Sequence, residues 1–160
     1  LGAVLTAAAF GASAVDTDLG TLNGPWANSP GVVNGDISDK YTFDIASASP
    51  VASSANTLPL SFSTLSIYNI SGFEVKLYNS SDNVLGTAIF DGANFILNTV
   101  PLAVANDYYF RVTGTTTGTN GGMYSFALAP VPEPSSLLLI SFGVIALLSA
   151  GRVRSVTLPT

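Results

Sequence analysis

Apolar and polar residues alternate with a period of two at several points along the middle of the chain. Tyr41, Phe43 and Ile45, for example, are separated by the polar residues Thr42 and Asp44. This period is typical of a β-strand that buries one face and exposes the other. The same pattern recurs three more times, so the sequence predicts strands at residues 41–45, 73–77, 108–112 and 124–128.

Further strands are expected in four segments with less strict alternation. Turn-forming pairs such as Asn34-Gly35 and Asp91-Gly92 separate the apolar segments, and no stretch between Val15 and Pro130 sustains a helical period. About eight short strands at this spacing are typical of a sandwich. We therefore predict an all-β fold, a jelly-roll-like β-sandwich at residues 15–130, with the additional strands at residues 17–22, 58–67, 84–90 and 94–100.

The alternation ends before the last thirty residues, which form three consecutive parts. The first part, residues 131–136, begins with the sequence Val131-Pro132-Glu133-Pro134. Both prolines lack a backbone N–H, and each pushes the residue before it out of the α region. This part is therefore expected to be extended and accessible to a processing enzyme.

An uncharged, apolar segment follows at residues 136–151. As a helix with a rise of ~1.5 Å per residue it would be roughly 24 Å long. The aliphatic stems of the flanking arginines extend it towards the ~30 Å hydrocarbon core of a bilayer. We predict a transmembrane helix here, whose anchoring residues are Leu137, Leu138, Leu139, Ile140, Phe142, Val144, Ile145, Leu147 and Leu148.

Two arginines set the expected orientation of this helix. Arg152 and Arg154 form a basic stop at residues 152–154, before a tail at residues 155–160. Positively charged ends of membrane helices tend to stay in the cytoplasm, so residues 15–130 are expected on the other side of the membrane. The alternative is an ordinary C-terminal anchor that is never processed.

The first fourteen residues are predicted to be a second targeting segment. Residues 1–10 are apolar and rich in alanine, and Ala12-Ser13-Ala14 fits the small-x-small pattern that signal peptidase cuts. Cleavage after Ala14 would make Val15 the first residue of the mature chain. Because no Met precedes Leu1, we expect residues 1–14 to be the remnant of a signal peptide. A first β-strand is disfavoured, since alanine-rich sequence is poor strand material.

The C-terminal segment resembles the PEP-CTERM sorting signal of Gram-negative surface proteins, in which a Pro-Glu-Pro motif precedes a transmembrane helix and an arginine cluster. The resemblance implies that the helix holds the exported protein in the inner membrane until an exosortase, a membrane cysteine transpeptidase, cuts near the motif. It also implies delivery to the cell surface or extracellular matrix, and an association with exopolysaccharide and biofilm. Members usually end at the basic cluster, whereas here residues 155–160 follow.

The region before this segment carries two further resemblances. Residues 37–43 look like the FxDxF motif of a group of PEP-CTERM proteins, with Ile37 replacing the first Phe and Tyr41 the second. Residues 39–129 are similar to bacterial pre-peptidase C-terminal domains, small exported β-sandwiches that accompany secreted enzymes or surface proteins. This similarity implies a binding or structural module without catalytic activity. Its landmarks are residues 39–43, 75–78, 107–112 and 122–126.

The composition of residues 15–130 argues against several classes of function. This region of about 116 residues carries nine acidic residues against Lys40, Lys76 and Arg111, a formal net charge of −6. Phosphate would repel such a domain, so we exclude nucleic acid as a partner. The chain contains neither Cys nor His, which removes disulfides, thiol catalysis, zinc–thiolate sites and the commonest general base. We therefore predict that the protein is not an enzyme and needs no cofactor.

Calcium is the one ion that the acidic residues would suit. Asp36, Asp39 and Asp44 are close in sequence and carry the oxygen ligands that calcium prefers. Their spacing fits no EF-hand loop, however, and Asp36 and Asp39 equally suit a turn and a strand entry. The sequence leaves both interpretations open, with Asp36 and Asp39 as the candidate metal ligands.

Two other candidates for chemistry also have structural interpretations. Glu74 and an Asp would form a carboxylate pair for glycoside hydrolysis, yet Glu74 also pairs naturally with Lys76 or Arg111 on a solvated face. Trp26 lies between Pro25 and Pro30, where it would serve either to stack on a sugar or to plug a loop.

Together these observations predict an exported surface or extracellular-matrix protein with a non-catalytic structural or adhesion role. Its expected partners are signal peptidase, the exosortase, the inner membrane transiently, and exopolysaccharide or other surface glycans. A carbohydrate- or calcium-binding module is the alternative, and a secreted hydrolase is a further, less favoured one.

Overall fold

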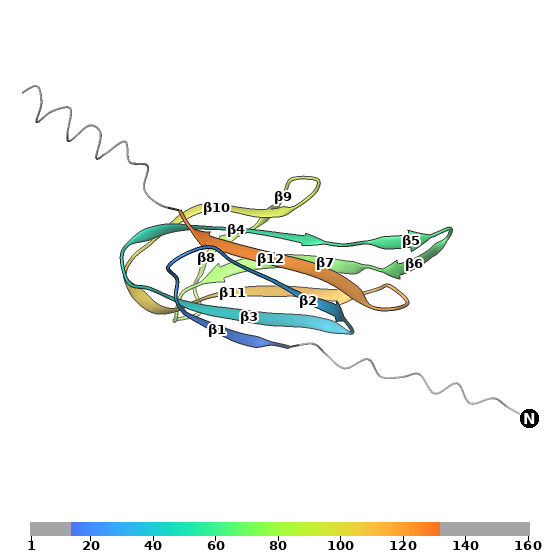
Figure 1. The fold of residues 1–160 in the computed structure, drawn as a ribbon, viewed down its shortest axis with the longest axis horizontal. Coiled ribbons are helices and arrows are strands. Elements are labelled where there is room, and N and C mark those ends of the chain that lie inside the picture. The colour runs from blue at the N-terminus through green and yellow to red at the C-terminus, as the bar shows by residue number, and fades with distance from the viewer. Residues whose placement is uncertain (1–13, 132–160) are drawn as a thin grey trace, which may run out of the picture.

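The computed structural model describes residues 14–131 of the chain, and these residues are all-β. They form two five-stranded sheets and a two-stranded hairpin (Figure 1). The first sheet has the order β1-β3-β11-β7-β8, with bounds Asp16–Thr21, Asp36–Ile45, Ala105–Thr116, Ile70–Tyr78 and Val84–Thr87. The second has the order β2-β12-β4-β10-β9, with bounds Trp26–Val33, Gly122–Pro130, Ser49–Thr57, Phe95–Leu102 and Ile89–Phe90. The hairpin consists of β5 (Leu60–Phe62) and β6 (Leu65–Tyr68).

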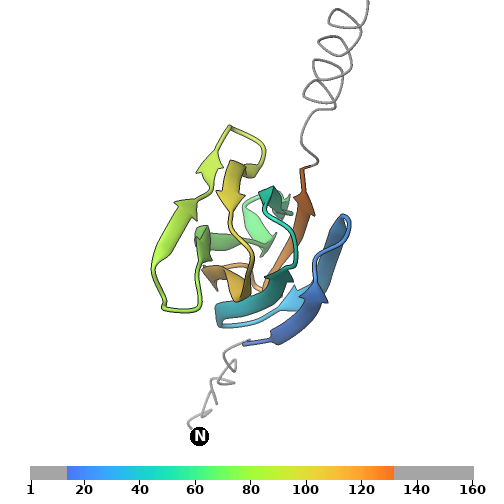
Figure 2. The same ribbon diagram turned by 90° about the vertical axis from the view of Figure 1, so that its left-hand side faces the viewer.

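The two sheets stack face to face, as the view from one end shows (Figure 2). Neighbouring strands pair antiparallel, except that the edge strand β1 runs parallel to β3. Figure 1 shows β12 ending near one end of the sandwich, whereas β1 begins part-way along it. In register, Asp16 at the start of β1 lies opposite Lys40 in the middle of β3.

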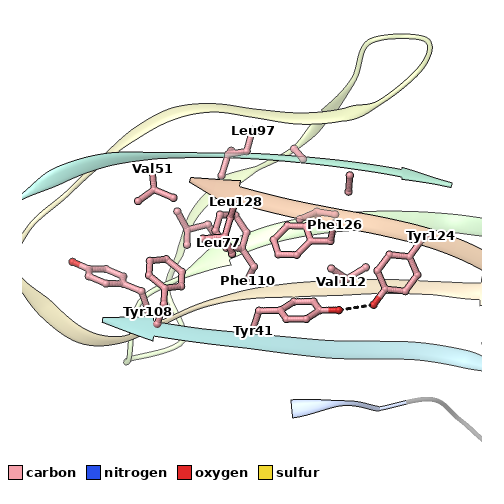
Figure 3. Packing of buried hydrophobic residues seen from close by; sticks show 14 of the residues in the cluster. Tyr41, Val51, Leu77, Leu97, Tyr108, Phe110, Val112, Tyr124, Phe126 and Leu128 are labelled. Carbon is pink, nitrogen blue, oxygen red and sulfur yellow. Dashed lines mark hydrogen bonds between the residues drawn. The ribbon is translucent and has the colours of Figure 1, made fainter. Parts of the chain in front are cut away.

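A single aromatic core fills the space between the sheets (Figure 3). Side chains of β3 and β12 alternate between buried and accessible positions, as the period of two predicts. The rings of Tyr41 and Phe126 stack across the sheets at a centroid distance of 4.9 Å, and those of Phe43 and Phe110 stack at 5.8 Å. The predicted all-β sandwich is confirmed, including the four strands with strict alternation.

Two of the looser predicted segments each contain two strands. Residues 58–67 hold β5 and all of β6 except Tyr68, and this hairpin turns at Ser63 with a φ of 55°. Residues 84–90 hold β8 and β9, between which the chain passes from the first sheet to the second. Neither break contains a Gly, Pro, Asn or Asp, so the strongest turn residues are missing there.

Two strands of the second sheet were not predicted. β2 contains Pro30 and Gly31, residues that favour turns, and it tolerates them because it lies at the edge of the sheet. β4 consists mainly of Ser and Ala, which have a weak preference for strands, yet it lies between β12 and β10. In both strands, pairing within the sheet outweighs local propensity.

Candidate functional site

The chain leaves the sandwich directly at the predicted sorting motif. β12 ends at Pro130, and the N–H of Val131 still donates a hydrogen bond to the carbonyl oxygen of Pro50 at 2.7 Å. No linker therefore separates the domain from residue 131. The other motif residues, Pro132, Glu133 and Pro134, lie outside the described residues, as do the whole predicted anchor and the basic stop at residues 152–154.

The entry to the domain coincides with the predicted signal cleavage. Ala14 is exposed, whereas Ala12 lies outside the described residues. The N–H of Val15 donates to Oδ1 of Asp39 at 2.8 Å, and the N–H of Lys40 donates to the carbonyl oxygen of Val15 at 2.8 Å. Within the described residues, these contacts tie Val15, the residue that follows the predicted cut, to β3.

Asp39 belongs to a buried polar chain that links the two sheets. Its carboxylate, on β3, is 0 % exposed and accepts a hydrogen bond from the hydroxyl of Tyr124 on β12. Because that hydroxyl donates to the carboxylate, the hydroxyl of Tyr41 donates to Tyr124 at 2.9 Å (Figure 3). Burial raises the pKa of both hydroxyls, and for Tyr124 the hydrogen bond to Asp39 raises it further. Both phenols therefore stay protonated as donors.

The two candidate calcium ligands lie on opposite faces of β3. Asp36 is exposed, and its Oδ1 accepts a hydrogen bond from the hydroxyl of Thr115 at 2.9 Å, whereas Asp39 points into the core. Asp44 accepts a hydrogen bond from the N–H of Asp107 at 3.0 Å. No group of three carboxylates suited to a metal ion occurs within residues 14–131. The structure does not bring Asp36 and Asp39 together, and calcium binding stays a prediction.

The other candidates occupy the places that their structural interpretations predict. Glu74 pairs with Lys76 at 2.8 Å on the partly exposed face of β7. Trp26 turns towards the core, with ring centroids 5.2 Å from Tyr41 and 6.4 Å from Phe126. Trp26 thus packs on the core at the edge of the sandwich beside β12, as the loop-plug interpretation predicts. It is half-buried and also lines a hollow on the second sheet, so sugar stacking stays a prediction.

A hollow on the second sheet escaped the sequence analysis. It has a volume of about 630 Å³, and its floor includes Ala27, Ala52, Ala127 and Ala129. In the sheet, Ala127 lies opposite Ala27 on one side, and Ala129 lies opposite Ala52 on the other. These methyl groups leave the hollow open because no larger side chain fills it. Sequence reasoning missed it because it depends on β2 and β4, the two strands that were not predicted.

The comparisons with known proteins gave a family match and a structural similarity. Residues 130–155 match the family described as the PEP-CTERM protein-sorting motif. Among solved structures, the chain is similar to the pre-peptidase C-terminal domain of a collagenase from Bacillus anthracis. The identity is 20 %, the TM-score is 0.49, and the similarity covers 72 % of this chain and 96 % of that one. No curated protein matches the sequence.

The family match confirms the predicted sorting segment. It spans the Pro-Glu-Pro sequence, the apolar segment and Arg152 and Arg154. The motif marks an exported protein with a membrane-associated C-terminal sorting signal, and it implies an exosortase as the processing partner. Within residues 14–131 there is no helix of the length and apolarity needed to cross a membrane.

Proposed function

We propose that the protein is a non-catalytic component of the cell surface or the extracellular matrix, with a structural or adhesion role beside exopolysaccharide in a biofilm. The observation that carries this proposal is the junction at Val131, where the last strand of a compact sandwich runs straight into the matched sorting segment. A domain placed in this way is delivered whole when the chain is cut just beyond it.

The proposed route has two cuts. Signal peptidase cleaves after Ala14 during export, and the helix at residues 136–151 then holds the domain on the periplasmic side of the inner membrane. The exosortase cuts within residues 131–136 and passes the domain to the surface. The exposure of Ala14 and the end of β12 at Pro130 support the positions of both cuts, since each then falls outside the strands of the sandwich.

The chemistry of the domain supports a role without catalysis. The chain has no His or Cys, and the described carboxylates of Asp36, Asp39 and Glu74 are each engaged by a neighbouring side chain. A carbohydrate- or calcium-binding module is the alternative, and a secreted hydrolase is less favoured.

The test compares cells with and without the exosortase gene. In cells with the enzyme, released protein should end within residues 131–136 by mass spectrometry. In cells without it, the protein should stay in the inner-membrane fraction at its uncut mass. Glu133→Ala should retain the protein in the same way, with Glu74→Ala as the matched acidic control. Released protein that still carries residues 137–150 would contradict the proposal and leave a plain anchor.

A further inference from the structure

A buried carboxylate meets the backbone nitrogen of the first residue in the predicted mature chain. Asp39 is fully buried, and its two oxygens accept hydrogen bonds from the Val15 N–H and the Tyr124 hydroxyl. Among residues 14–131, no Lys or Arg nitrogen lies within ion-pair distance of this carboxylate. A charge taken out of water is costly unless an opposite charge lies beside it. The site has its hydrogen bonds but lacks a positive partner.

Cleavage after Ala14 would place a positive charge at this point. We propose that Asp39 is the binding site for the α-ammonium group of Val15, which forms when the signal segment is removed. Water adds across the Ala14–Val15 bond, so that Ala14 ends in a carboxylate and the Val15 nitrogen leaves as an amine that takes up the released proton. The inference rests on the proposed export and cleavage.

The site needs no rearrangement to receive this group. The Val15 nitrogen already lies 2.8 Å from Oδ1 of Asp39, and the hydrogen bond from Lys40 to the Val15 carbonyl fixes the other side of the residue. β1 then pairs with β3 from Asp16 onwards. Ala14, on the far side of the bond to be cut, is exposed. Contacts with β3 therefore hold this nitrogen beside Asp39.

The cut changes the strength of this contact. In the precursor, Val15 offers one neutral N–H, whereas the mature terminus offers a full positive charge and three donors. The carboxylate already makes the precursor bond charge-assisted, and the cut adds an opposite charge on the donor side, which offsets the cost of burying Asp39. The difference corresponds to roughly a tenfold change in the unfolding equilibrium. Removal of the signal segment would thus lock β1, the edge strand of the first sheet, onto β3.

The experiment uses the mature chain, Val15 to Thr160, in detergent micelles. One sample carries the free α-ammonium group and a second is acetylated at the same nitrogen, which keeps an N–H but removes the charge. Acetylation should raise the unfolded fraction about tenfold at a fixed denaturant concentration. In Asp39→Asn, acetylation should change nothing. In Asp16→Asn, which removes an exposed carboxylate from the neighbouring residue, the full effect should persist.

A chain that starts at Ala14 keeps the proposal testable if Asp39→Asn does not fold. Its charged amine is displaced by one residue, so it should behave like the acetylated sample. Equal stability of all three native-sequence chains would overturn the inference, as would an acetylation effect that Asp39→Asn leaves intact. N-terminal sequencing of the exported protein separates this result from a failure of the proposed processing, because it shows independently whether the chain begins at Val15.

Discussion

The two sheets share one core but present different outer faces. In the first sheet, Arg111 on β11 lies in register between Lys40 on β3 and Lys76 on β7. The Lys40 ammonium sits 4.4 Å from the ring centre of Tyr109, and Lys76 pairs with Glu74. This face therefore carries charges that are partly neutralised by neighbours in the same sheet.

The outer face of the second sheet is uncharged, and small residues cover the part of it that β2, β12 and β4 form around Ala127. None of its five strands contains an Asp, Glu, Lys or Arg. Ala127 lies between Ala27 and Ser54 in register, and the open hollow of about 630 Å³ covers this region. Inward positions are mostly apolar in both sheets, whereas outward positions are charged in the first sheet and uncharged in the second. The core and the outer surface are therefore specified separately.

The largest expected effect tests whether both sheets depend on the same core. Phe110 belongs to the first sheet and Phe126 to the second, and both are essentially unexposed. Phe110→Ala and Phe126→Ala should each lower the free energy of unfolding by ~3–5 kcal/mol, since each removes a packed ring. Phe43→Ala should do the same. Denaturant midpoints measure the loss, with Glu74→Ala expected to cost ~0–1 kcal/mol as the exposed control.

Near-equal midpoints for these variants and the unaltered chain would show that the ring positions are wrong. A large loss of unfolding free energy for the variant in one sheet alone would mean that the two sheets have separate cores.

The same difference between the sheets explains how much of the fold the sequence predicts. In β3 and β12, bulky residues alternate with polar ones, so the pattern itself identifies the strand and its inward face. β4 carries its inward residues Val51, Ser53 and Ala55 among other small residues, so no such contrast is visible. Its place in the sheet comes from long-range pairing with β12 and β10, which a local pattern does not contain.

The candidate site was predictable where it depends on local sequence. Proline chemistry and the apolar segment identify the sorting motif without knowledge of the fold, and the family match confirms it. The partners of Asp39, by contrast, are Val15 and Tyr124, which lie 24 and 85 residues away. Spacing suggested a shared metal site with Asp36, whereas alternation along β3 places the two carboxylates on opposite faces.

A charge introduced on each outer face tests whether the two sheets differ in the polarity of these faces. Ala127→Glu would place a carboxylate in the apolar hollow between Ala27 and Ser54, and should cost ~1–3 kcal/mol of unfolding free energy. Ser38→Glu, on the exposed face of β3 near Lys40, should stay within ~0.5 kcal/mol. Thermal or denaturant melts compare the two directly. Equal costs would mean that the two faces do not differ in polarity.

Alkaline pH should weaken the first sheet through Tyr109. Burial raises the pKa of this tyrosine to about 12, and a hydrogen bond to Asp82 adds to the shift. Because the folded state favours the protonated phenol, its contribution to stability is intact below pH ~10 and is lost as the pH rises towards about 12. Tyr109→Phe should therefore flatten the decline in melting temperature over this range. It will not abolish the decline, since the pKa of Tyr124 is raised as well.

Absorbance of the tyrosinate form provides the second measurement for this prediction. The phenols of Tyr41, Tyr109 and Tyr124, whose pKa values are all raised, should resist ionisation until the domain unfolds, and Tyr109→Phe should remove one of the three. An unchanged decline in the variant would assign the whole alkaline effect to the core and none to the outer face.

The smallest effect concerns Asp36, at the exposed end of the first sheet. Its carboxylate accepts a hydrogen bond from the hydroxyl of Thr115, so Asp36→Asn should cost about 0.5 kcal/mol at most, the lower end for one exposed bond. Calcium or EDTA should leave the melting temperature unchanged, because a ligand stabilises a protein only if it binds the folded state preferentially. Asp36 and Asp39 point to opposite faces of β3 and do not offer calcium a common set of oxygens. A calcium-dependent rise in melting temperature that Asp36→Asn abolishes would contradict this expectation, and it would give the charged face of the first sheet a binding role that the uncharged second sheet lacks.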